Sequence, residues 1–457
     1  MRTNWKNENW IKKLAKIKTS VNPLTFVFWA LLTPLFLHLS ISKVQTRYFW
    51  VFGLIFSIII FVFFLPKVLI FVCFLVAIYL FFYWLRQPQN IEEGQYILRA
   101  TVIKTSSKYA ILNVQNTNFI IYLNKFTTKT PLRVSQIVDV EGSVVKINEI
   151  SNFHIANSIN YLINRGNVIR VSQAKYSFNA FIDNYSQSGG VFFNKYWKLL
   201  LFGKNYDSES IVEKAIKINI VHLIVISGLH FDLLFTILLK PLSKIKNIKV
   251  QKSLEIVAYI FIFMYLASLQ NFIPGIRAFI TQICSRKFKL KFSQSIIIAA
   301  FCVFFLNFNN IITISFILSF SCTILIVYLG RLLKKFKIKY KILQYLILIT
   351  CIYIYMSLFS LSFNKYLNLL GLFYTIIFTP IIELVYIFSL IFCYSPSFLD
   401  LIYQGLDWLI NFASTLSVIL LIPIKITQKT LLIWMILWAS FISIGLFYRG
   451  KRKNKKI

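Results

Sequence analysis

The stretch INIVHLIVISGLHFDLLFTILL, residues 218–239, decides the class of this protein. It is apolar over roughly the 20 residues that a helix needs to cross the hydrocarbon core of a bilayer. Polar side chains interrupt it, among them His222, Ser227 and His230. Polar groups inside a lipid-embedded helix are costly, and where they cluster they line a cavity or a path. The stretch therefore predicts a membrane helix that carries part of a functional site.

The composition of the whole chain agrees with a membrane protein. Of the 457 residues, 58% are hydrophobic and only 14% are charged, and the mean hydropathy is +0.69. Soluble globular domains carry about one quarter charged residues. The composition excludes a cytosolic enzyme, a secreted protein and a disordered scaffold.

The charge balance is strongly basic, because 50 Lys and Arg stand against 15 Asp and Glu, a net charge of +35. A membrane protein this basic is expected to meet a polyanion, either lipid headgroups or nucleic acid. A genome rich in A and T also raises the lysine content, but it does not explain the shortage of acidic residues.

The six cysteines lie singly in apolar stretches, without the CxxC spacing of a metal or redox site. We expect them to act as small hydrophobic residues, and we expect neither a metal ion nor a cofactor. The N-terminus is polar and basic and leads into an apolar run without a small-residue cleavage site, so we expect no signal peptide.

Apolar runs divide the chain into two membrane units. Residues 24–41, 48–65 and 68–85 predict three spans in an N-terminal unit, 1–88. Seven or eight further spans are predicted in a channel domain, 216–448, which a basic tail, 449–457, follows. The runs of this domain are 218–239, 254–269, 293–308, 311–329, 342–363, 367–392, 399–422 and 431–448. The predicted fold class is a polytopic α-helical membrane protein with about 10–11 spans.

Between the two membrane units, in residues 89–175, the hydrophobic period changes to two. Apolar residues alternate with polar ones in two predicted strands: Tyr96, Leu98, Ala100 and Val102 in the first, Val138, Val140 and Val144 in the second. Turn-forming clusters separate these short strands from their neighbours. The pattern predicts a small inserted all-β domain of the OB type.

The predicted β domain has a basic surface with aromatic residues among the charges. Residues 94–175 hold ten Lys and Arg against three acidic residues. Such a surface binds single-stranded nucleic acid, because cations follow the phosphates while rings stack on the bases. The residues expected to bind DNA are Lys104, Lys108, Tyr109, Lys125 and Arg133. Alternatively, the aromatic residues of the domain fill its core: Tyr109, Phe119, Tyr122 and Phe126.

Residues 176–215 are expected to form an interfacial amphipathic helix and a linker, because 178–201 mix aromatic residues with Lys195 and Lys198 and lack a clean span. Loop charges predict the topology. The basic loops at 240–252 and 331–341 are expected in the cytoplasm, and the uncharged loop at 307–310 outside. Counting back places the β domain outside, whereas Pro380 within the run 367–392 leaves the parity of the last spans open.

Residues 222–232 admit more than one chemistry. A hydrolase would use Ser227 as the nucleophile and His230 or His222 as the base, but Val225 stands where the Gly-x-Ser-x-Gly elbow has its first glycine. A metal site lacks a third ligand at a suitable spacing. Two alternatives remain: polar side chains that specify helix packing, and a polar pathway. We favour the pathway and do not expect an enzyme.

Two further stretches place polar residues in apolar surroundings. Pro274-Gly275 breaks the chain before Arg277, and the stretch that follows is too short for an ordinary crossing. Broken helices are tolerated at membrane depth only where they face protein or water. Ser315 and Ser319 lie four residues apart, on one face of a predicted helix.

These stretches resemble the signatures of the ComEC family of competence proteins, which are membrane channels for DNA uptake. Residues 222–230 are similar to a block that runs from His-Leu to Ser-Gly-Leu-His, and Arg277-Ala278 after Pro274-Gly275 to a second block. Residues 316–320 resemble a Phe-x-Leu-Ser-Phe block, and Asn368-Leu369-Leu370 with Pro380 resembles a later one. Residues 153–170 are similar to the tail of the OB-like domain of that family.

The resemblance implies a multi-pass channel of the cell membrane that imports single-stranded DNA into the cytoplasm during natural transformation. The DNA pathway would be lined by His222, Ser227, Gly228, His230, Pro274, Gly275, Arg277, Ser315, Ser319 and Asn368. The partners would be single-stranded DNA, the lipid bilayer, a DNA receptor, a separate nuclease and a cytoplasmic ATP-driven motor. The oligomeric state stays open.

The chain also departs from the family that it resembles. Many relatives carry a C-terminal domain resembling metallo-β-lactamases, but no His-x-His-x-Asp cluster occurs here, so we expect no nuclease. Lys204 follows Gly203 where the family usually has an acidic residue, and Asp232 stands where small or apolar residues are common. The alternative function is a solute or lipid transporter with an external β sensor domain.

Overall fold

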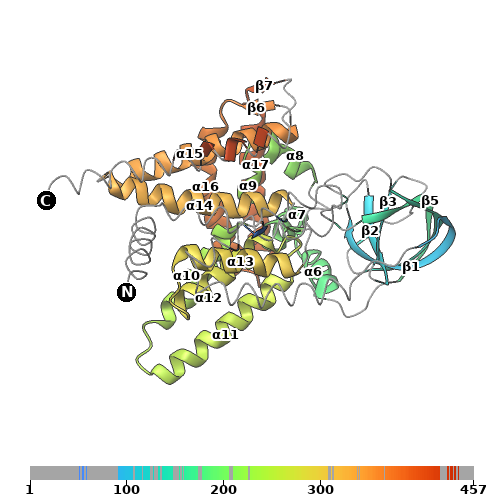
Figure 1. The fold of residues 1–457 in the computed structure, drawn as a ribbon, viewed down its shortest axis with the longest axis horizontal. Helices are drawn as coiled ribbons and strands as arrows, with labels where there is room; N and C mark the ends of the chain where they lie inside the picture. The colour runs from blue at the N-terminus through green and yellow to red at the C-terminus, as the bar shows by residue number, and fades with distance from the viewer. Residues whose placement is uncertain are drawn as a thin grey trace, which may run out of the picture.

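The structure of the chain is a computed structural model, which shows a small β barrel at one end and a helical bundle beside it (Figure 1). It describes residues 91–422 with short gaps, single positions between 51 and 58, and single positions between 430 and 441. The gaps are 106–108, 116, 124–126, 128–131, 134–135, 148–153, 155–156, 158, 173–177, 205–208, 225–226, 307–309, 311–312, 337, 339 and 365. The predicted N-terminal unit, the run 431–448 and the basic tail therefore lie wholly or mostly outside the described residues.

The β domain is a closed barrel of five strands. The strands are β1 (Gly94–Thr105), β2 (Tyr109–Val114), β3 (Thr117–Tyr122), β4 (Ile137–Lys146) and β5 (Ile159–Ser172). Their order around the barrel is β1-β2-β3-β5-β4, and β4 closes on β1. All pairs are antiparallel except β3 with β5. The prediction of a small separate all-β domain is confirmed.

The barrel core comes from the predicted alternation. Val102, Val138 and Val140 are at most 1% exposed, and the polar residues between them point outward because successive strand residues face opposite sides. The alternative in which aromatic residues fill the core holds for Phe119 and not for Tyr122, and DNA binding by this surface stays a prediction. Phe119 is buried and stacks on Tyr161, with ring centroids 5.5 Å apart, whereas Tyr122 is 57% exposed.

The helical bundle follows the barrel along the chain. Its helices are α6 (Phe178–Ser186), α7 (Val191–Phe202), α8 (Glu209–Lys217), α9 (Val221–Ile224), α10 (Gly228–Leu242), α11 (Ile248–Ala267), α12 (Ile273–Arg286), α13 (Phe292–Leu306), α14 (Ile314–Lys335), α15 (Lys341–Asn364), α16 (Gly371–Ile391) and α17 (Pro396–Thr415). Two short strands, β6 (Tyr366–Asn368) and β7 (Ile419–Leu421), pair antiparallel. The strand β6 joins α15 to α16, so this small ladder ties the chain after α17 back to the bundle.

Among the described residues, five segments are long and apolar enough to cross a membrane. They are Val221–Leu242, Ile248–Ala267, Ile314–Lys334, Lys341–Ser362 and Gly371–Ile391. The apolar helix α13 is shorter. The helix α12 is only 14 residues long, as expected for this stretch. It begins at Ile273, so Pro274 and Gly275 lie in its first turn, and the interruption lies before them, between the end of α11 at Ala267 and Ile273. The segments agree with a membrane protein built on apolar helices.

The residues expected to form one interfacial helix differ from that prediction. They form two helices, and α7 is buried in the bundle rather than lying on its surface. Phe193, Tyr196 and Leu200 are each 0% exposed and belong to one core with residues of α16 and α17. The partners that cover α7 lie about 200 residues further along the chain, so the local pattern of α7 gave no sign of them.

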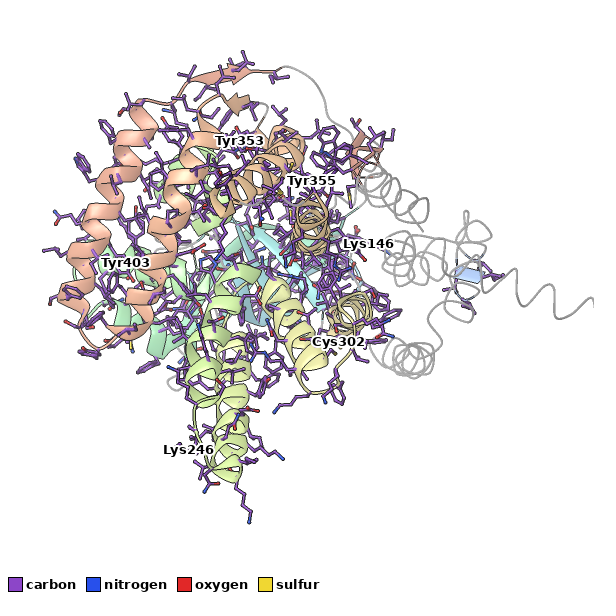
Figure 2. All side chains as sticks on the ribbon, turned by 90° about the vertical axis from the view of Figure 1, so that its left-hand side faces the viewer. Lys146, Lys246, Cys302, Tyr353, Tyr355 and Tyr403 are labelled. Carbon is purple, nitrogen blue, oxygen red and sulfur yellow. The ribbon has the colours of Figure 1, made fainter. Side chains whose placement is uncertain are left out.

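The run 399–422 also differs from its prediction as a span. The helix α17 is not among the apolar segments long enough to cross, because Asp400, Asp407 and Asn411 lower its hydropathy. Both carboxylates face the protein: Asp400 Oδ1 accepts from the backbone N–H of Phe193 at 2.6 Å, and Asp407 Oδ1 accepts from the Tyr196 hydroxyl at 2.9 Å. The helix α17 also contacts α16, because the hydroxyl of Tyr403 on α17 lies 2.7 Å from the hydroxyl of Ser389 on α16. Figure 2 labels Tyr403.

Candidate functional site

Ser227 and Gly228 lie at a helix start, where Ser227 is the N-cap of α10. The helix α9 ends at Ile224 and α10 begins at Gly228. His230 Nδ1 accepts from the backbone N–H of Ser227 at 3.1 Å and lies 3.0 Å from Ser227 Oγ. Because Nδ1 is the acceptor, a neutral His230 carries its proton on Nε2. That Nε2 is buried and has no hydrogen-bond partner among the described residues.

The contact between Ser227 and His230 serves the start of α10. Its 3.0 Å distance is within the reach of a nucleophile and base, but the same two residues close the first turn of the helix. A hydrolase histidine is oriented by a third group, and in the described part of the chain none bonds to His230 Nε2. The geometry favours a helix cap, and the hydrolase reading stays an untested prediction.

The two other polar stretches face each other across α12 and α14. Arg277 Nε donates to Ser319 Oγ at 2.9 Å. One turn before, Asn271 Nδ2 donates to Ser315 Oγ at 2.8 Å, and Ser315 Oγ lies 3.1 Å from Asn271 Oδ1. The two serines of α14 thus each bind one polar residue: Ser315 binds Asn271, which precedes α12, and Ser319 binds Arg277 within α12. The sequence marked these residues separately, and the fold brings them together.

Arg277 also reaches α10, where it lies against Gly228. A Cβ atom at Gly228 would stand 1.6 Å from Arg277 Nη2, so any larger residue would displace the guanidinium. Arg277 is only 6% exposed. The carboxylate whose charge acts on Arg277 is that of Asp232, and its Oδ1 accepts a hydrogen bond from Gln282 Nε2 at 2.9 Å. Gly228, Arg277 and Ser319 therefore form one constellation, contributed by α10, α12 and α14.

A second buried cation, Lys204, was noted in the sequence only as a departure from the family. It follows Gly203, which ends α7 in the left-handed conformation with φ 70°. Lys204 is 4% exposed, and its Nζ has no hydrogen-bond partner in the described parts of the chain. Burial lowers the pKa of Lys204 to about 8, Asp183 raises that pKa, and Lys198 lowers it further. Nothing in the sequence around a lysine that follows a helix-ending glycine indicates burial, so the burial of Lys204 was not predicted.

The remaining predicted pathway residues lie in the same bundle with different surroundings. His222 is half-buried on α9, and Pro274 and Gly275 are buried in the first turn of α12. Asn368 is 1% exposed; its Nδ2 donates to the Lys217 carbonyl at 3.0 Å, and its Oδ1 accepts from the N–H of Leu370 at 2.9 Å. Asn368 therefore braces the junction of β6 with α8, and its place on a DNA pathway stays a prediction.

The predicted DNA-binding residues of the barrel are described in part. Lys104, Tyr109 and Arg133 are half-buried, and Lys104 Nζ donates to Asn157 Oδ1 at 3.4 Å. Lys108 and Lys125 lie outside the described residues. The register pairs Tyr109 of β2 with Tyr122 of β3. The exposed Tyr122 therefore lies beside Tyr109, which we expect from the sequence to bind DNA.

The chemistry available at this site is electrostatic. In the described segments, no three His, Cys, Asp or Glu side chains come together so as to hold a metal ion. The described cysteines are free thiols. What the site offers is a fixed guanidinium, hydroxyl groups and the amide groups at the start of α10, which are suited to binding an anion.

Comparisons with known proteins give one family, whose match includes this constellation, and two relatives. A family model described as "Competence protein" matches residues 200–452. The uncharacterized MG316 homolog of Mycoplasma pneumoniae is 28% identical over 292 residues, 61% of this chain and 74% of that protein. The uncharacterized protein MG316 of Mycoplasma genitalium is 26% identical over 189 residues, 41% of this chain and 48% of that protein. No solved structure matches the chain.

Proposed function

Because the chain belongs to the Competence protein family, we propose that it is a membrane channel through which single-stranded DNA enters the cytoplasm. Membership of this family suggests a role in DNA uptake, and the apolar helices suggest a membrane location. The strand would pass through the bundle in the cell membrane, which the chain crosses several times. The chain itself performs no catalysis in this proposal.

The observation that carries the proposal is the state of Arg277. Its guanidinium is buried among apolar helices, is anchored by Ser319, and forms no ion pair with any described carboxylate. A charge held away from water without a partner destabilises a protein. Asp232 acts on Arg277 without forming an ion pair with it, whereas a passing polyanion supplies a negative charge in direct contact. Moving such a strand through lipid needs water and a few fixed cations rather than a catalytic group. Phosphate contacts of this kind are independent of base sequence and weaken with salt.

The barrel supports the same proposal. Five strands in the order β1-β2-β3-β5-β4 form a small closed Greek-key-like barrel, and OB folds are five-stranded barrels that bind oligonucleotides. We assign the barrel to the OB-like class and place it outside the cell, where it would collect the strand. Tyr122 and the basic residues of the domain would contact bases and phosphates.

Three partners complete the proposed process. A receptor would deliver DNA to the barrel, a separate nuclease would degrade the strand that is not imported, and a cytoplasmic ATP-driven motor would pull the other strand. The lipid bilayer surrounds the apolar helices.

Transport in proteoliposomes tests the proposal. The full chain is reconstituted, and a fluorescent single-stranded oligonucleotide is added outside, so that its concentration gradient is directed inward. Nuclease added outside then degrades all oligonucleotide that was not imported. The proposal predicts a protected single-stranded fraction that falls as salt rises, and none in protein-free vesicles. Transport of a small solute or lipid without any protected DNA would establish the transporter alternative instead.

The hydrolase reading is tested in the same vesicles. Ser227→Ala should retain most of the protected fraction, because Ser227 caps α10 rather than attacking a substrate. Complete loss of activity in a variant that reaches the membrane at wild-type levels would favour a nucleophile.

A further inference from the structure

The start of α10 lies directly beneath a guanidinium that belongs to another helix. Gly228 is the first residue of α10, and the space where its Cβ would stand is filled by Arg277 Nη2. Ser319 on α14 holds the guanidinium from the other side through Nε. The position of Arg277 is thus fixed by three helices.

The donors of this guanidinium are mostly unused. Nε has Ser319 Oγ as its acceptor, and within the described residues neither η nitrogen has one. The charged and titratable groups that act on Arg277 are Asp232, on α10, and the thiol of Cys322, on α14. Asp232 forms no ion pair with Arg277, and its Oδ1 is hydrogen-bonded to Gln282. An arginine that is 94% buried, given its 6% exposure, therefore presents two free η-amino groups toward α10.

The first turn of α10 adds donors of the same kind. Ser227 caps the N–H of His230, and the N–H groups of the two residues before it have no acceptor within the helix and carry a positive partial charge. His230 does not add to them, because its Nδ1 faces Ser227 and its ring packs against Tyr386, with centroids 4.6 Å apart. A guanidinium and helix amide groups are both donors, so an anion is the ligand that suits them.

We propose that Arg277 and the first turn of α10 form a seat for a single phosphate group, which the η nitrogens and the amide groups bind from two sides. The ligand class is a phosphate oxyanion. Its source is a phosphodiester of the imported strand if the proposed function holds, and otherwise the phosphate of a lipid headgroup. Because Gly228 has no side chain, the guanidinium can lie against the helix start, and Ser319 is a positioning residue that aims the guanidinium.

Binding by the full chain in a phosphate-free detergent tests the seat. The probe is a fluorescent oligothymidylate, titrated at several salt concentrations. Arg277→Gln should weaken binding about 10-fold and reduce the slope of log K against log salt by about 0.7, the loss of one phosphate contact. Ser319→Ala should weaken binding less while keeping the slope, because the charge remains. Arg286→Gln, on the exposed end of the same helix, is the matched control and should change neither.

A second arm separates the two sources of phosphate and keeps the seat testable if no DNA binds. Inorganic phosphate and phosphatidylglycerol are each titrated while the thermal unfolding of the full chain is followed. Stabilisation of the wild type by either ligand, lost in Arg277→Gln and reduced in Ser319→Ala, upholds the seat even if the channel proposal fails. The proposed phosphate seat is wrong if DNA binding and ligand stabilisation are the same in the wild type, in Ser319→Ala and in folded Arg277→Gln. If Arg277→Gln does not fold, Arg277→Lys takes its place, since it retains the charge but loses the paired η donors.

Discussion

Replacing Lys204 by methionine should make the protein more stable at neutral pH. The Lys204 ammonium is 4% exposed without a hydrogen-bond partner in the described residues, and burial lowers its pKa from 10.5 to about 8. At about 1.36 kcal/mol per pKa unit, this difference corresponds to about 3 kcal/mol of stability lost below pH 8. Methionine has a similar length and carries no charge, so Lys204→Met should recover most of that free energy.

The effect should depend on pH with a definite sign. Between pH 8 and 10.5 the unfolded chain holds the Lys204 proton and the folded chain does not, so the stability of the wild type rises with pH across this window. The advantage of Lys204→Met should therefore be largest at pH 7 and fall to about 1.4 kcal/mol at pH 9.5. Tryptophan fluorescence during titration of a mild detergent with dodecyl sulfate measures the free energy of unfolding at both pH values.

A matched control separates burial from loss of charge in general. Lys246 lies exposed between α10 and α11 (Figure 2), and Lys246→Met should change the free energy of unfolding by less than about 0.5 kcal/mol. If Lys204→Met destabilised the protein at pH 7, or if its effect were equal at pH 7 and 9.5, the reasoning about an unpaired buried ammonium would be wrong.

Three further substitutions probe the packing. The two in the bundle are measured by the same titration, and the one in the barrel, whose strands hold no tryptophan, by circular dichroism during that titration. Tyr196→Phe should cost about 1–3 kcal/mol because the Asp407 carboxylate loses its 2.9 Å donor; an unchanged midpoint would mean that water replaces the hydroxyl. Asn368→Ala should cost about 2 kcal/mol, since a buried carbonyl and a buried N–H lose their partner, and a neutral result would contradict its role as a brace. Gly142→Ala should cost about 1–3 kcal/mol, because its Cβ would stand 3.0 Å from backbone of Gly166. Gly330→Ala, with nothing within 4 Å, is the control, and an equal loss there would refute the steric argument.

The barrel could be predicted from the sequence because its signal is local. Alternation in β1 and β4 marked which residues face inward, and the structure buries Val102, Val138 and Val140 accordingly. The parallel pairing of β3 with β5 could not be predicted in the same way. Strand pairing depends on contacts between segments far apart in the chain, which a local period does not encode.

The constellation around Arg277 shows the same limit. Chain position marked Gly228, Arg277 and Ser319 as unusual polar or flexible residues in apolar stretches. It did not show that Arg277 binds Ser319, 42 residues away, or that it fills the space above Gly228. Sequence patterns place side chains on a face of a helix, whereas the choice of neighbour follows from how whole helices pack.

Two expectations that differ from the structure share one physical cause. The helix α7 has the composition of an interfacial helix, yet α16 and α17 cover it, and α17 turns Asp400 and Asp407 toward α7. The carboxylates of α17 accept hydrogen bonds from α7, and α17 covers the aromatic residues of α7. The environment of either helix therefore cannot be predicted from its own sequence. The burial of Lys204 was missed for the same reason, because only the folded chain shows that its Nζ is buried without a hydrogen-bond partner among the described residues.

Photocrosslinking of a stalled strand tests most directly whether DNA follows the route through α10, α12 and α14. An oligonucleotide with 4-thiothymidine at regular intervals and streptavidin on its trailing end is driven into the full chain in proteoliposomes, irradiated, and the attached peptides are identified. We expect crosslinks to the segments around Gly228, Arg277 and Ser319 as well as to the barrel. These crosslinks should be absent when the gradient that drives the strand inward is abolished. Crosslinks confined to the barrel or to the lipid-facing side of α11, in vesicles that still protect DNA, would contradict this route.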